Sequence, residues 1–100
     1  MNDYIVKLRP EVYEMLDVIY TNICFQSIDN AAAEQIITAI ENAILSLNTL
    51  PNRGSMITSG IYANKGYRQL LVKNFQIIYK VFEQTREVVV VFVKHEKMNL

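Results

Sequence analysis

The stretch that most constrains the fold runs from Gly66 to His95, because it reads as three short strands joined by two tight turns. The predicted strands are 66–73, 75–82 and 87–94, each rich in β-branched and aromatic residues and too short for a stable helix. Lys73-Asn74 marks the first turn, since Asn tolerates a positive φ, and four polar residues after Phe82 mark the second. Connections this brief predict an antiparallel meander, because a parallel return needs about a dozen residues or more.

The N-terminal half predicts one strand and two helices. A β-rich run at 4–8 forms the strand, and Pro10 then opens a helix that extends to about Cys24. Residues 27–30 (Ser-Ile-Asp-Asn) offer side chains that can cap the start of a helix. A second amphipathic helix follows from 31 to about 47. Two such helices with a short break between them predict an antiparallel hairpin.

The remaining signals complete the fold prediction. Pro51 ends the second helix, and 55–65 is interpreted as a mobile loop with at most one short extended piece. The element order is therefore β-α-α-β-β-β within a single domain, 1–100. Because two amphipathic helices need an apolar face to cover, the predicted class is α+β, with the helical hairpin packed on one face of a mainly antiparallel four-stranded sheet. We expect the functional site on the other, partly open face, beside the loop from Arg53 to Lys65.

The composition is typical of a packed domain that stays inside the cell. Apolar residues make up 51% of the 100 residues, and the longest apolar run, Val88–Val93, is far shorter than the roughly 18 residues of a membrane-spanning helix. The N-terminus lacks the basic start and long apolar run of a secretory signal. The single cysteine, Cys24, cannot form an internal disulfide, which fits a reducing cytoplasm. With no metal-ligand cluster or phosphate loop in the sequence, we expect no metal and no cofactor.

The net charge of zero hides an asymmetry between the two halves. Residues 1–50 contain two basic and seven acidic residues, a balance of −5, and residues 51–100 contain eight basic and three acidic residues, a balance of +5. The C-terminal half can therefore hold a local positive field that suits an acidic partner. The alternative is that these charges are solvated at strand edges, where Lys also prevents unwanted strand pairing.

Several segments, in their order and spacing, carry a resemblance to a known family. They are Pro10, 32–43 with 47–54, Gly66-Tyr67-Arg68, 73–81 and 91–95. The chain resembles the RelE/ParE superfamily, the toxin half of bacterial type II toxin–antitoxin pairs, over nearly its whole length. The resemblance implies the same β-α-α-β-β-β fold and a growth-inhibiting toxin of a plasmid-stabilisation, or addiction, module. It also implies a cognate antitoxin that keeps the toxin inactive by strand-edge and groove contacts.

One branch of this superfamily cleaves messenger RNA on the ribosome without a metal. The attack of a 2′-hydroxyl on its phosphate requires proton transfer and a cation that stabilises the charge on phosphorus. The resemblance assigns phosphate binding to Arg68 and proton transfer or phosphate binding to His95. The expected RNA-binding residues are the cations Arg53, Lys65, Lys94 and Lys97 together with Tyr62, which would stack on a base.

The sequence also departs from the RNA-cleaving branch. Members of that branch are strongly basic and carry an aromatic residue soon after the His or Arg, whereas here Glu96 follows His95 and no aromatic residue comes later. The ParE-like branch instead poisons DNA gyrase by binding it. We predict ribosome-dependent mRNA cleavage from Arg68 and His95, with gyrase inhibition as the alternative and a non-toxic, antitoxin-binding member as a second alternative. In structural terms, Arg68 could instead pair with an acid at a sheet edge, and His95 could be merely exposed.

Overall fold

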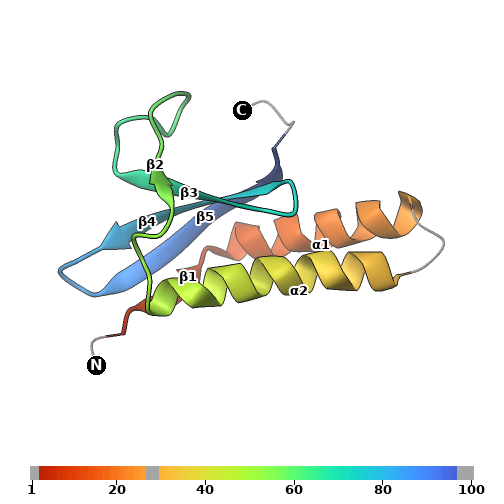
Figure 1. Ribbon diagram of the computed structural model, residues 1–100. Helices are drawn as coiled ribbons and strands as arrows, with labels where there is room; N and C mark the ends of the chain where they lie inside the picture. The colour runs from red at the N-terminus through yellow and green to blue at the C-terminus, as the bar shows by residue number, and fades with distance from the viewer. Residues whose placement is uncertain (1–2, 27–29, 97–100) are drawn as a thin grey trace.

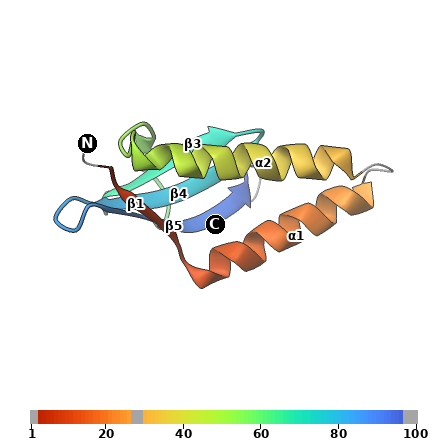
Figure 2. The same ribbon diagram turned by 90° about the horizontal axis from the view of Figure 1, so that it is seen from below.

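Two helices lie side by side against one face of a single sheet in the computed structural model, which describes residues 3–26 and 30–96 (Figures 1 and 2). The elements in chain order are β1 (Ile5–Leu8), α1 (Pro10–Gln26), α2 (Ala31–Leu45), a 3-10 turn (Ser46–Asn48), β2 (Ser55–Met56), β3 (Tyr67–Val72), β4 (Phe75–Phe82) and β5 (Glu87–His95). This arrangement confirms the predicted α+β class and the helical hairpin on one face of the sheet.

Within the described residues the sheet contains five strands in the order β1-β5-β4-β3-β2, so the predicted count of four is wrong by one. The additional strand is Ser55–Met56, which pairs antiparallel with Arg68–Gln69 and is the short extended piece that the loop prediction allowed. β1 runs parallel to β5, and the other pairs are antiparallel, so the meander is confirmed. Lys73 and Asn74 have φ values of +52° and +69°, as the two central residues of a type I′ hairpin turn require.

The helix boundaries differ slightly from those predicted. α1 continues past Cys24 to Gln26, while α2 gives way to the 3-10 turn after Leu45. Asn30 stands at the start of α2 but its side chain makes no capping hydrogen bond, so that predicted role is wrong; the other capping candidates lie outside the described residues. Within the described ranges, neither helix has the length and hydropathy needed to cross a membrane.

The main core fills the space between the helices and the sheet. It includes buried side chains from both helices, from the 3-10 turn and from β4 and β5: Val12, Leu16, Ile40, Ile44, Leu47, Ile77, Tyr79, Val88 and Val90. Fully burying an aliphatic side chain contributes about 1.5–3 kcal/mol each, so this layer is the principal source of stability. The apolar alternation of β4 places Phe75, Ile77 and Tyr79 on this side, which we call the near face.

The far face of the sheet carries a second, smaller cluster. Ile57, from the segment that follows β2, packs against Ile78 and Val91 together with the rings of Tyr62 and Tyr67. The predicted loop is thus folded onto the sheet, and Figure 1 shows it on the side opposite the helices. This segment covers only part of the far face.

Candidate functional site

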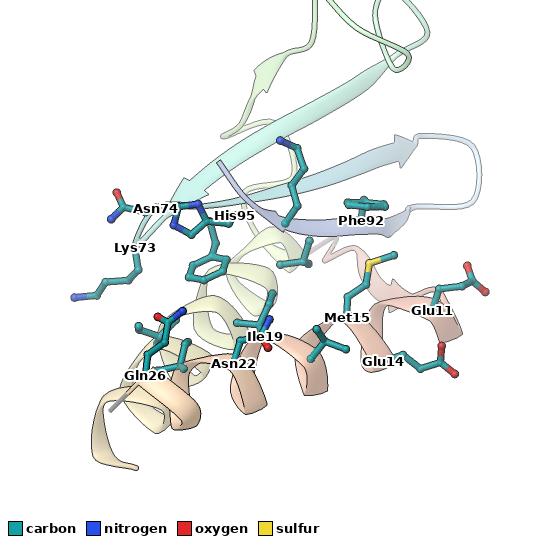
Figure 3. A pocket seen from close by; sticks show the side chains of 16 residues that line it. Glu11, Glu14, Met15, Ile19, Asn22, Gln26, Lys73, Asn74, Phe92 and His95 are labelled. Carbon is teal, nitrogen blue, oxygen red and sulfur yellow. The ribbon is translucent and has the colours of Figure 1, made fainter. Parts of the chain in front are cut away.

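A groove with a cavity volume of about 730 Å³ opens between α1 and the C-terminal half of β5 (Figure 3). This volume falls in the range of about 300–1,000 Å³ that is usual for ligand pockets. The floor of the groove is apolar and is formed by Met15, Ile19, Ile23, Ile36, Phe75 and Val93. A groove of this size and polarity can receive the apolar side chains of a partner segment.

The groove exists because β1 is much shorter than β5. β1 pairs only with Glu87–Val90, and the Arg9 N–H donates a last hydrogen bond to the Val90 carbonyl at 3.1 Å before Pro10 begins α1. Beyond Val90, β5 has β4 on one side and, within the part of the chain that the structure describes, no strand on the other. A strand edge of this kind is a template for pairing with another chain.

A β-bulge decides which side chains of β5 enter the groove. The pairing of β5 with β4 shifts between Ile78 and Tyr79, which leaves Val91 as the extra residue. Because side chains alternate between the two faces of a strand, one extra residue inverts the alternation that follows it. Val90 therefore packs in the near-face core before the bulge, and Val93 does so after it.

The same inversion brings His95 to the rim of the groove. Its ring packs edge-on against Phe75, with 5.2 Å between ring centroids and 82° between ring planes. Figure 3 shows Lys73 at this end of the groove and Glu11 and Glu14 at the other end. The groove is therefore basic near His95 and acidic near the start of α1.

Arg68 is bound to the turn that follows α2. Its Nη1 donates to the carbonyl oxygens of Gly54 at 2.7 Å and Asn52 at 3.3 Å. The Gly54 N–H in turn donates to the Tyr79 hydroxyl at 2.9 Å, and burial raises the pKa of Tyr79. The partners of Arg68 are thus backbone carbonyls, not the acid expected in its structural alternative.

The two residues assigned to RNA cleavage lie apart. Arg68 pairs with Tyr79 across β3 and β4, whereas His95 pairs with Phe75 across β5 and β4, so four residues along β4 separate the two positions. At about 3.3 Å per residue and about 4.8 Å between strands, the Cα atoms of Arg68 and His95 are about 16 Å apart. The turn that holds the Arg68 guanidinium leads into β2, on the side of β3 away from β5.

Three of the predicted RNA-binding residues lie on the segment between α2 and β3. Arg53 donates to the Ser46 hydroxyl at 2.6 Å, and the Lys65 ammonium donates to the Ile61 carbonyl at 3.0 Å. The Tyr62 ring packs edge-on against Tyr67 at 4.9 Å between centroids, on the far face. Tyr62 thus lies on the far face, whereas Arg53 lies beside the end of α2, and none of the three residues lines the groove.

The structure places Lys94 beside His95 in the groove lining, with only 8% of its surface exposed, while Lys97 lies outside the described residues. No candidate predicted from the sequence lies on the α1 side of the groove, which includes Val18 and Asn22. An apolar Val18 away from the buried stripe of α1 was the available signal. Among residues 3–26 and 30–96, no three His, Cys, Asp or Glu side chains gather as a metal-binding group.

Comparisons with known proteins place this architecture among bacterial toxins. Residues 6–100 match the model of a protein family described as the ParE toxin of type II toxin–antitoxin system, parDE. No curated protein matches the sequence. Among solved structures, the chain is similar to one from the chromosomal ParDE system of P. aeruginosa, with a TM-score of 0.76 and 18% identity over 95% of this chain and 98% of that one.

A second similar structure comes from the toxin–antitoxin complex RelBE2 of Mycobacterium tuberculosis. Its TM-score is 0.66, with 16% identity over 93% of this chain and 98% of that one. At identities of 18% and 16%, the two solved structures establish only that this chain has the same fold. The family is established by the match of residues 6–100 to the family model.

Proposed function

Given that this chain belongs to the ParE family of toxins of type II toxin–antitoxin systems, we propose that it arrests bacterial growth by binding a protein target rather than by cutting RNA. The resemblance to the RelE/ParE superfamily drawn from the sequence is confirmed by the family match. In the ParE-like branch the target is DNA gyrase, and we take gyrase as the target here. The proposed setting is the bacterial cytoplasm.

The observation that carries this proposal is the placement of Arg68. Its guanidinium binds the carbonyls of Gly54 and Asn52, and the Cα atoms of Arg68 and His95 are about 16 Å apart. Cleavage by 2′-hydroxyl attack needs a cation and a proton-transfer group around one phosphate, within hydrogen-bond reach of it. A binding toxin has no such requirement, so the arrangement favours binding.

The antitoxin is the proposed occupant of the groove. Its segment would add backbone hydrogen bonds along β5 beyond Val90 and place apolar side chains on Ile19 and Val93. The basic end of the groove, near Lys73, would receive acidic residues of that segment, and Glu11 at the other end would receive basic ones. This distribution of charge would attract the antitoxin segment and would also fix the direction in which the segment lies in the groove.

Ribosome-dependent mRNA cleavage is the second candidate function. The observation that favours it is the position of His95 at the groove rim, where Lys73 and Lys94 also belong to the lining. In this candidate His95 would transfer protons and Arg68 would stabilise the charge on phosphorus. The RNA-binding residues would be Arg53, Lys65, Lys94, Lys97 and Tyr62. Binding of RNA along this rim would then require Arg68 to leave its carbonyl partners.

Induced expression of the chain in bacteria separates the candidates. Uptake of radiolabelled thymidine and methionine would be followed side by side after induction. We expect thymidine incorporation to fall first, with filamentous cells, and His95→Ala to remain fully toxic. An early collapse of methionine incorporation that His95→Ala relieves would instead establish the cleavage reaction.

A further inference from the structure

The far face of the sheet has an uncovered half that the proposed function does not use. The segment after β2 covers Ile78 and Val91, but it does not reach the end of the sheet where β4 turns into β5. Side chains from four strands form what we call the far-face strip: exposed Ile5, Lys7 and Phe82 together with half-buried Tyr67, Lys80 and Val89, of which Tyr67 and Val89 also border the Ile57 cluster. The strand registers place them on one face, because Lys7 and Lys80 both pair with Val89.

Lys80 is held between two aromatic rings of the strip. Its ammonium nitrogen lies 5.3 Å from the centroid of Tyr67 and 5.5 Å from that of Phe82. A Cβ added to Gly66 would lie 3.4 Å from the Lys80 Cε, which is an ordinary contact distance, so the backbone at Gly66 packs against the stem of this lysine. The two rings and the lysine therefore form one ordered group on the surface. Because these side chains are already ordered, they would lose little conformational entropy when a partner binds.

The strip is apolar where a solvated sheet face would be polar. A sheet with one face on the core usually alternates apolar and polar residues, with the polar ones outward. Here the outward positions include Phe82, which is 42% exposed, and Ile5, which is 60% exposed. Exposed aromatic and aliphatic side chains gathered in this way mark interaction surfaces, where aromatic residues are enriched.

The charge of the strip indicates the chemistry of its partner. Lys7 forms an ion pair with Glu87, which leaves Lys80 as the surplus charge of the strip, and Lys65 lies next to Gly66. The surplus suits acidic residues flanked by apolar ones. A nucleic acid is disfavoured because the sequence pI is about 6.6, whereas nucleic-acid-binding domains generally have a pI above about 9.

We propose that the far-face strip is the surface by which the toxin holds an acidic, partly apolar surface of its protein target. This inference rests on the proposed function, because it assigns the target to one face of the sheet. The groove for the antitoxin opens between α1 and β5, and the strip lies on the face away from the helices. Toxicity and antitoxin binding should therefore be separable by substitution.

The test uses three substitutions in the strip of the full chain: Lys80→Glu, Phe82→Ser and Ile5→Ser. Each would be assayed for colony formation after induction, for melting temperature and for copurification with the cognate antitoxin. We expect about tenfold or greater recovery of colonies, with melting and antitoxin binding unchanged, because central interface contacts change affinity by that factor or more. Lys80→Arg keeps the charge and should remain toxic.

The matched control is Leu71→Ser, because Leu71 lies on β3 outside the strip and is 61% exposed. It should be as toxic as the unsubstituted chain. Folded strip variants that still arrest growth, or that lose antitoxin binding together with toxicity, would overturn the inference. The large exposure of Phe82 and Ile5 keeps two of the variants interpretable even if Lys80→Glu fails to fold. If the unsubstituted chain leaves growth unaffected, the proposed function itself is wrong. If the unsubstituted chain is toxic and the strip variants are equally toxic, only the inference about the strip is wrong.

Discussion

The hydroxyl oxygen of Tyr79 accepts a hydrogen bond from the Gly54 N–H at 2.9 Å, so a buried side chain in β4 fixes the turn that follows α2. The approach is close enough to require glycine, because a Cβ at Gly54 would lie 2.5 Å from the Gln69 carbonyl oxygen and 2.7 Å from the Tyr79 hydroxyl. Arg68 holds the carbonyl of the same residue. The Gly54 peptide thus joins the helical layer to β3 and β4, and its partners can be tested singly.

Tyr79→Phe removes the acceptor and leaves the buried Gly54 N–H without this partner. We expect the free energy of unfolding to fall by about 1–3 kcal/mol, the usual cost of an unsatisfied buried donor. Urea denaturation measures it directly. Tyr13→Phe, at a 58% exposed position of α1, is the control and should change stability by less than about 0.5 kcal/mol. Equal effects at the two positions would contradict a special role for the Tyr79 hydroxyl.

The same tyrosine makes stability depend on alkaline pH. Burial raises the pKa of Tyr79, so the folded chain keeps a proton that an unfolded chain loses above about pH 10. The stabilisation is complete below that pH and is lost as pH rises towards the folded-state pKa. Denaturation between about pH 8 and about pH 11 should therefore show a steeper fall for the unsubstituted chain than for Tyr79→Phe.

The difference between those two chains isolates Tyr79, because other tyrosines titrate in both. The pKa of Tyr4, for example, is raised by its hydrogen bond to Glu83. Identical slopes for the two chains would show that the Tyr79 hydroxyl is not the titrating group.

Arg68→Ala removes the donor to the Gly54 and Asn52 carbonyls. We expect a loss of about 1–3 kcal/mol in unfolding free energy, because the bonds are charge-assisted and one carbonyl is part of the buried Gly54 peptide. Toxicity should fall only as far as the folded fraction does, and Arg68→Lys should recover part of both. Thermal melts and growth assays on the same variants check this. An Arg68→Ala chain that is as stable as the parent yet harmless would assign Arg68 to the target or to RNA.

Val18→Asp should weaken antitoxin binding by about tenfold or more, since it places a carboxylate on the apolar wall of the groove. Tyr13→Asp is a closely matched control, because Tyr13 lies on the same helix, is also 58% exposed and does not line the groove. Calorimetric titration with the cognate antitoxin gives both dissociation constants. A similar loss at Tyr13 would move the antitoxin from the groove to the outer surface of α1.

The local elements could be predicted because each has a local cause. The β-branched runs and the Lys73-Asn74 turn specify the meander, and Pro10 specifies the start of α1. The bulge at Val91 could not be predicted, because Val88–Val93 is apolar throughout. Without alternating polar residues, the sequence does not indicate which of these side chains face the helices. For the same reason, the sequence could not decide whether Lys94 or His95 faces the helices.

The site depends on contacts between residues that are far apart in the sequence, and local sequence patterns do not predict such contacts. Arg68 has its partners on a turn more than a dozen residues earlier, at Asn52 and Gly54. The groove follows from the parallel pairing of β1 with only half of β5, and nothing in the run 4–8 specifies its neighbour. Residues 55–65 show no clear hydrophobic period, so the sequence did not predict that this segment packs on the far face through Ile57.

β1 has four residues and β5 has nine, so part of the edge of β5 is left without a neighbouring strand from β1. This has a consequence for the chain in the absence of a partner. A strand that extends past its neighbour can pair with the same strand of a second copy, and this pairing closes at two copies because it uses the free edge of both. A partner that pairs along β5 would then also keep the chain monomeric. Removal of that partner would free the edge of β5 again, so the concentration of the free chain would decide how much of it stays monomeric.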